Sequence, residues 1–143
     1  MIEQIKYQGE LFSIIIRNEY SENGVNFVTP NDFSQQLAYI KHPKGKEIIP
    51  HLHNKVSREV HFTHEVLFIK KGKIRVNFYN NEKNYVESRI LNKGDVILLA
   101  GGGHGFDVLE EVEMIEVKQG PYAGELDKER FAAQKDLQKA ITE

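Results

Sequence analysis

The residues of this chain with the clearest chemical potential are histidines and one glutamate near the middle of the sequence. The stretch from Gly45 to Gly72 holds four of the six histidines. His51 and His53 are two residues apart, so on a β-strand they would share one face. Glu65 begins an apolar run that is typical of a strand, and His104 follows a second, glycine-rich stretch. Three imidazoles and one carboxylate, brought together from separate strands, are typical ligands of a divalent metal ion.

The composition narrows the class of protein and its partners. The chain of 143 residues, with 40% hydrophobic and 28% charged residues, fits one globular domain. Its formal net charge is -2 and no basic stripe occurs, so we expect no nucleic-acid partner. It has no cysteine, which excludes disulfides and thiolate ligands. We find neither the apolar region of a signal peptide nor an apolar run of about 18 residues, and therefore expect a cytoplasmic protein with no membrane partner.

The elements that must position these residues are short strands. Turn signals recur at fairly even spacing, at Gly45, Gly72 and residues 80–84, 92–95 and 101–103. The segments between them are apolar and β-branched, which predicts an antiparallel sandwich or barrel. In this interpretation Gly72 forms a turn between two separate strands.

Two further patterns concern surfaces. In residues 60–69 both sets of alternate side chains are largely apolar, so we expect the even-numbered face to be covered by another sheet or by a second subunit. This predicts a homodimer. Residues from about 125 to 142 are rich in helix formers and predict a C-terminal amphipathic helix. Its apolar side is formed by Leu126, Ala133, Leu137, Ala140 and Ile141.

The first histidine stretch resembles the first motif of the cupin superfamily. That motif is a glycine, five residues, His-x-His, a glutamate, six residues and a glycine. Here Gly45, His51, His53, Glu65 and Gly72 follow in that order. The gap between His53 and Glu65 is 11 residues, where the family has three or four, and we interpret the difference as a loop or strand extension.

The second cupin motif is a glycine, five residues, Pro-x-Gly, two residues and a histidine. Gly94 and His104 match it, but Ala100 replaces the proline and the histidine comes one residue early. The resemblance covers about residues 35–118. It implies an all-β fold, namely a single-domain jelly-roll β-barrel over all 143 residues. The barrel core would lie at about 35–118, with N-terminal strands in 1–34 and the helix outside.

The resemblance also implies a metal centre. His51, His53, Glu65 and His104 would bind one divalent ion, such as Zn, Fe, Mn or Ni. Four protein ligands leave two positions of a six-coordinate ion for water or substrate, where the ion can act as a Lewis acid or activate water. His61 would share the face of Glu65 on a regular strand. It could then replace a ligand, act as a base, or simply be a hydrogen-bonded histidine of the barrel mouth.

A narrower resemblance is to the sugar-nucleotide ketoisomerases among small cupins. In those enzymes a tyrosine-bearing strand leads through a Lys-Gly turn into a His-x-His strand, as Tyr39, residues 44–45 and residues 51–53 do here. An aromatic, acidic tail follows their last strand, and residues 121–131 are similar in style. The family's Asp-x-Arg-Gly segment is missing from this chain.

This second resemblance implies proton transfer beside a sugar carbonyl. His53 or His51 would be the base and Tyr39 a helper. Arg17, Arg58 or Arg75 could hold a pyrophosphate. We therefore expect an enzyme that isomerises or epimerises a small polar substrate, such as a sugar or sugar nucleotide. An iron-dependent dioxygenase and a non-catalytic module that binds a small ligand or metal remain as alternatives.

Overall fold

The structure is a computed structural model that describes residues 1–134. In chain order its elements are β1 (Ile2–Tyr7), β2 (Glu10–Ile16), β3 (Gly24–Phe27), β4 (Ala38–Lys41), β5 (Glu65–Tyr79), β6 (Tyr85–Asn92), β7 (Val96–Leu99), β8 (Gly103–Lys118) and the 3-10 helix η1 (Gly124–Asp127). Among the described residues they form two compact units, one of Met1–Tyr20 with residues 63–134, the other of Ser21–Phe62. The predicted all-β class is confirmed. The jelly roll, and a single domain with its barrel core at about 35–118, stay predictions.

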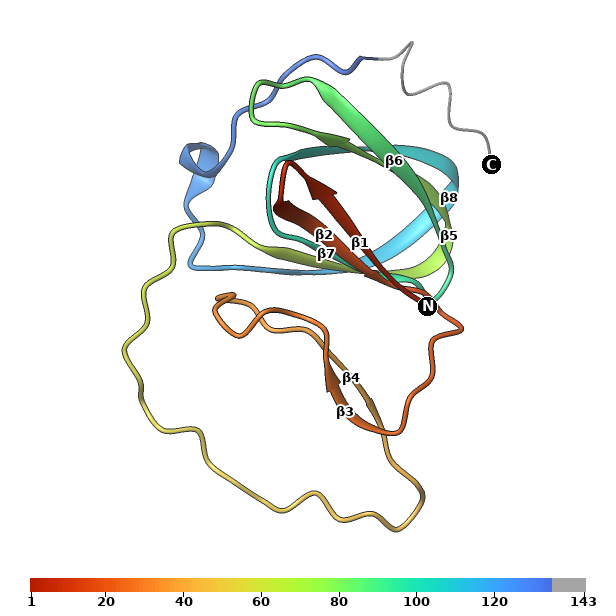
Figure 1. Cartoon of the computed structure of the whole chain (residues 1–143), viewed down its shortest axis with the longest axis vertical. Coiled ribbons are helices and arrows are strands. Elements are labelled where there is room, and N and C mark those ends of the chain that lie inside the picture. The colour runs from red at the N-terminus through yellow and green to blue at the C-terminus, as the bar shows by residue number, and fades with distance from the viewer. Residues whose placement is uncertain (135–143) are drawn as a thin grey trace. The chain divides into compact units, whose positions relative to one another are not determined.

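The first unit is a six-stranded antiparallel sheet built around β5. Strands β1, β2, β7, β5 and β6 are neighbours in that order, and β8 pairs with β5 off this path. The first half of β5 pairs with β7 and the second half with β6, whereas β8 accompanies both halves. Figure 1 shows the resulting curl of the sheet, with β8 bending around its outside.

The core of this unit lies on one face of the curled sheet. Along β5 the side chains of Ile74, Val76 and Phe78 alternate into it, as a period of two requires, and all are at most 1% exposed. Ile97 and Leu99 of β7 belong to the same cluster. Burying a side chain of this size contributes about 1.5–3 kcal/mol, so this cluster stabilises the curl.

The paired strands β5 and β8 bend sharply near their middle. Their pairing is regular up to Ile69 and again from Ile74, with register shifts in between. Gly72 lies in this bend with a φ of 88°, a left-handed conformation that favours glycine. A Cβ at this position would lie 2.0 Å from the carbonyl oxygen of Glu111 on β8. The two backbones can approach this closely only because residue 72 has no side chain.

Our expectation of a turn between two strands at Gly72 was wrong. The chain continues through the glycine as one bent strand of 15 residues, and β8 is likewise one strand of 16 residues. The pattern was misleading because a left-handed glycine serves a β-bulge as well as a turn. A bulge bends a strand without ending its pairing, and the bulged region around Gly72 allows this sheet to curl.

A largely buried ion-pair network ties β1 and β2 to the turn between β6 and β7. Arg17 donates to Glu3 over 2.6 Å and to Asp95 over 3.1 Å. Asp95, which is 3% exposed, also accepts the backbone N–H groups of Asn18 and Asn92, at 2.9 and 2.7 Å. The hydrogen bond from Arg17 lowers the pKa of Glu3, and burial only partly opposes it. Arg17, a candidate for binding pyrophosphate, is therefore engaged in holding the sheet together.

The second unit contains the hairpin of β3 and β4, in which Asn26 lies opposite Tyr39. After β4, residues 42–62 contain no strand or helix. The expected strands across His51–His53 and from about residue 59 are therefore absent, and β5 begins only at Glu65. The physical reason is that this segment gains neither ladder hydrogen bonds nor burial, because Leu52, for example, is 92% exposed.

The predicted C-terminal helix at about 125–142 is not confirmed. Its described part is one short 3-10 helix, η1, after which residues 128–134 have no regular structure. Residues 135–143 lie outside the part of the chain that the structure describes. Among residues 1–134 there is no helix with the length and hydrophobicity to cross a membrane.

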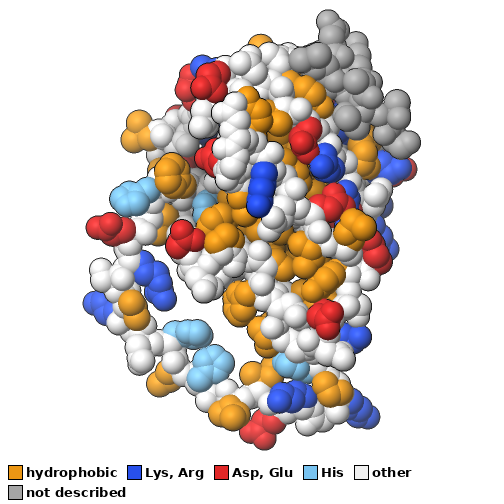
Figure 2. Space-filling view, in the orientation of Figure 1, with side chains coloured by type: hydrophobic (Ala, Val, Ile, Leu, Met, Phe, Trp, Pro, Cys, Tyr) orange, Lys and Arg blue, Asp and Glu red, His pale blue; other side chains and the backbone are white. Residues whose placement is uncertain are grey.

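In the first half of β5 the even-numbered face is exposed at Phe68 in the single chain. Phe68 is 40% exposed, and its cross-strand neighbour Ile115 on β8 is 53% exposed. Figure 2 shows one face of the molecule, on which acidic and basic side chains are interspersed with hydrophobic ones. The homodimer stays a prediction.

Replacing Gly72 with alanine should lower the free energy of unfolding by about 3 kcal/mol or more, because a left-handed alanine would also strike the carbonyl of Glu111. Gly9 is the matched control. Its φ is also positive, at 81°, but nothing lies within 4 Å of its Cβ position, so Gly9→Ala should cost only about 1–2 kcal/mol. Urea unfolding measures both variants, and equal losses would contradict the tight bend.

Replacing Asp95 with alanine should cost about 3–5 kcal/mol, because Arg17 and two backbone N–H groups lose a buried acceptor. Glu19→Ala removes an exposed carboxylate that lies 3.7 Å from the N-terminal ammonium, and should cost less than about 1 kcal/mol. Chemical denaturation distinguishes the two. Similar losses for both variants would show that the Arg17 network does not hold the sheet.

Candidate functional site

Two of the predicted metal ligands meet in the first unit. Glu65, the first residue of β5, places its Oε2 atom 3.6 Å from Nε2 of His104, near the start of β8. Their side chains are 16% and 28% exposed, so the pair is largely sheltered while still reachable from solvent. The structure thus brings together a carboxylate and an imidazole that are far apart in the sequence.

The bend of the β5–β8 ribbon explains why these two residues can meet. In the register of the sheet His104 lies opposite Phe78, at the far end of β5 from Glu65. In a straight strand Glu65 and Phe78 would lie roughly 40 Å apart, at about 3.3 Å per residue. The ribbon therefore curls back on itself until its two ends come into contact.

The electrostatics of the pair favour an ionised glutamate. His104 lowers the pKa of Glu65, burial raises it less strongly, and the nearby Lys118 lowers it further. An ionised carboxylate beside an imidazole has two uses. It is a ready ligand for a cation, and it can orient the ring as a proton acceptor.

The triple glycine before His104 lets the chain pass close to the core. Gly102 has a φ of 66°, and a Cβ there would lie 2.6 Å from the carbonyl oxygen of Tyr79. At Gly103 a Cβ would lie 3.0 Å from the ring of Phe131, which packs edge-on against Tyr79 with ring centroids 5.0 Å apart. These glycines leave room for the tight turn that delivers His104.

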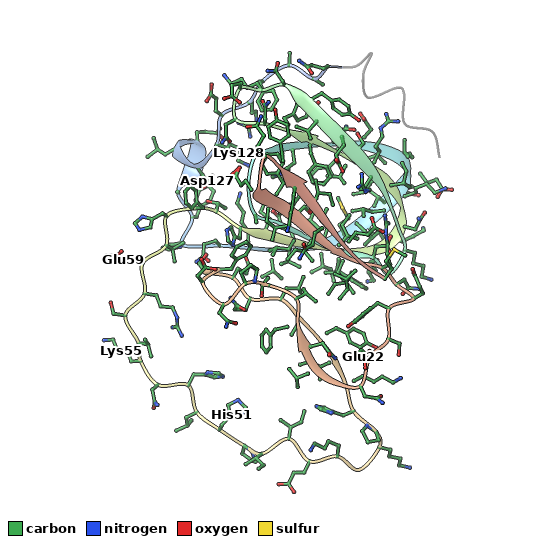
Figure 3. The ribbon with its side chains drawn as sticks, viewed as in Figure 1. Glu22, His51, Lys55, Glu59, Asp127 and Lys128 are labelled. Carbon is green, nitrogen blue, oxygen red and sulfur yellow. The ribbon has the colours of Figure 1, made fainter. Side chains whose placement is uncertain are left out.

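The sequence interpretation missed two charged residues beside the pair. Lys118, the last residue of β8, lies opposite Glu65 in the ladder and places Nζ 3.9 Å from Glu65 Oε1. The same Nζ lies 3.5 Å from Oδ2 of Asp127, which Figure 3 shows in the short helix η1 after β8. The hydroxyl of Thr63 donates to Asp127 and is the main cause of its lowered pKa. The only signal that could have identified Lys118 is its cross-strand pairing with Glu65. That pairing is known only once the register of β5 and β8 is known.

The other two predicted ligands, His51 and His53, belong to the second unit. Their rings lie edge to face with centroids 5.1 Å apart, and both side chains are exposed. Nδ1 of His51 lies 2.9 Å from the carbonyl oxygen of Ile49. The two rings are thus close together although the backbone that carries them is not a strand, as Figure 3 illustrates for the segment around His51.

The remaining predicted residues of the second unit are spread along it. Tyr39 is half-buried on β4. Arg58 is exposed in the irregular segment, and so is His61, whose Nε2 lies 3.5 Å from Oε2 of Glu59. The expected position of His61 on the strand of Glu65 was wrong, because β5 begins four residues later.

Arg75, a candidate for binding substrate, lies on β5 within a polar network. Its Nη2 donates to Oδ2 of Asp107 over 3.0 Å, and Asn77 donates to the same oxygen over 2.9 Å. The Ser88 hydroxyl then donates to the side-chain oxygen Oδ1 of Asn77 over 2.6 Å. Because Arg75 is already paired with the carboxylate of Asp107, binding a phosphate would require it to break this ion pair.

The chemistry of the Glu65–His104 pair fits part of a metal site. One ionised carboxylate and one imidazole suit Zn, Fe, Mn or Ni. Among residues 1–134 the structure contains no group of three or more potential ligands in the arrangement of a metal site. The structure therefore brings two of the four predicted ligands together, and the metal site with all four ligands stays a prediction.

Comparison of the chain with models of protein families, with curated proteins and with solved structures gave no match in any of the three. The cupin resemblance therefore stays a prediction that rests on the spacing of the two motifs.

Replacing Glu65 with glutamine should reduce stability near neutral pH and matter less in acid. Its pKa is lower in the folded chain, so its carboxylate stabilises the fold above the unfolded pKa of about 4.3, and this contribution disappears as the pH falls through the folded value. Thermal unfolding between about pH 7 and pH 3 should show the two curves converging. The exposed Glu82 provides a control as Glu82→Gln, and a pH-independent gap for Glu65→Gln would contradict this account.

Proposed function

We propose that this protein binds one divalent metal ion and uses it to transfer a proton on a small polar substrate such as a sugar or sugar nucleotide. The observation that carries the proposal is the convergence of Glu65 and His104, two ligands predicted from separate motifs. His51 and His53 are the further ligands that the sequence predicts.

The residues around the pair support this choice of chemistry. Glu65 stays ionised, which suits it to ligate a cation. A bound divalent ion supplies a Lewis acid that polarises a substrate carbonyl. Lys118 and Asp127 add a donor and an acceptor that can orient substrate hydroxyl groups. The roles of His53 or His61 as base and of Tyr39 as helper are part of the proposal from the sequence.

Metal analysis of the purified protein tests the binding step. The wild-type protein should hold about one equivalent of a divalent metal, and replacing both His51 and His53 by alanine should abolish this content while leaving the sheet folded. Glu65→Gln and His104→Ala should each weaken binding about 10-fold or more. His42→Ala is the control, since His42 belongs to neither motif. Unchanged metal content in the His51 and His53 double variant would show that the ligand assignment is wrong.

Isotope exchange tests the chemical step. Keto-sugar nucleotides incubated with the metal-loaded protein in D2O should gain deuterium next to the carbonyl, as nuclear magnetic resonance can detect. If the protein loaded with ferrous iron consumes oxygen and shows no deuterium exchange, it is instead a dioxygenase. A protein that binds metal and does neither would contradict the proposed proton transfer on this class of substrate.

A further inference from the structure

The two carboxylate oxygens of Glu65 face different partners. Oε2 points to the ring of His104, at 3.6 Å, and Oε1 points to the ammonium of Lys118, at 3.9 Å. Lys118 is also the direct cross-strand partner of Glu65 in the ladder. The sheet itself therefore sets this lysine beside the carboxylate that we propose as a metal ligand.

Lys118 is shared with a second carboxylate outside the sheet. Its Nζ lies 3.5 Å from Asp127, and the hydroxyl of Thr63 in turn donates to Asp127. The side chains of Glu65, Lys118 and Asp127 are 16%, 32% and 18% exposed. The ammonium of Lys118 thus lies between two partly buried carboxylates. If it moves toward one of them, its attraction to that carboxylate increases and its attraction to the other decreases.

We infer that Lys118 competes with the metal ion for Glu65, and that Asp127 limits this competition by drawing the ammonium away. The inference rests on the proposed function. A positive charge about 4 Å from a ligand repels an incoming divalent cation and attracts the carboxylate that would bind it. A carboxylate on the opposite side of the ammonium offsets that effect.

The consequence is that the segment after β8 belongs to the site. Asp127 lies in η1, and the chain beyond it is anchored to the first unit by Phe131, whose ring packs edge-on against Tyr79. The ion pair of Glu129 with Lys83 is exposed and adds little to this anchor, so the ring packing holds Asp127 next to Lys118. The affinity for metal is therefore set jointly by the sheet and by a segment that supplies no metal ligand.

The test is a competition titration of the full chain with Co²⁺ against a chromophoric chelator. Lys118→Met removes the charge at nearly constant length and should tighten Co²⁺ binding about fivefold, the size expected for a partly exposed pair. Lys118→Arg keeps the charge and should bind as the wild type does. Asp127→Asn leaves the ammonium to Glu65 alone and should weaken binding about two- to fivefold.

The matched control is Lys83→Met, which makes the same change in charge at another ion pair of the same C-terminal segment. It should leave Co²⁺ affinity within twofold of the wild type. Thermal melting of each variant establishes that it is folded. If the wild type binds Co²⁺ and Lys118→Met binds it equally well or more weakly, the competition is refuted while the metal site stands. If the wild type does not bind Co²⁺, the proposed function fails, and the inference fails with it.

Discussion

The larger unit of this protein depends on one close approach, between the backbone of β5 at Gly72 and that of β8 at Glu111. A side chain on residue 72 would lie 2.0 Å from the carbonyl it now passes. Because the strands can touch here, the ribbon bends, its apolar face closes over the core, and its two ends meet. The contact of Glu65 with His104, and the chain of alternating charges through Lys118 to Asp127, follow from that geometry.

The all-β class could be predicted from the sequence because it depends on local pattern. Alternating apolar residues such as Ile74, Val76 and Phe78 identify a half-buried strand, and evenly spaced turn signals identify an all-β chain. The bend at Gly72 could not be predicted, because a left-handed glycine is compatible with a turn and with a bulge alike. Within its described part, residues 125–134, the C-terminal pattern did not predict the structure, since helical spacing alone does not stabilise a helix when residues 128–134 are mostly exposed.

The candidate site could be predicted in part for a similar reason. Glu65 and His104 were found because their residue types and spacing follow two short motifs. Lys118 and Asp127 were missed because a lysine at a strand end and an aspartate in a turn carry no such signal; only the register and the fold of the tail set them beside Glu65. The His-x-His pair was expected on a strand, yet the segment that carries it is irregular.

The most direct test of this account is an anomalous difference map from crystals grown with Co²⁺ or Zn²⁺. The account predicts a single strong peak about 2.0–2.2 Å from both a carboxylate oxygen of Glu65 and a ring nitrogen of His104. A peak bound elsewhere, or a structure in which a straight β5–β8 ribbon holds these two side chains far apart, would contradict it.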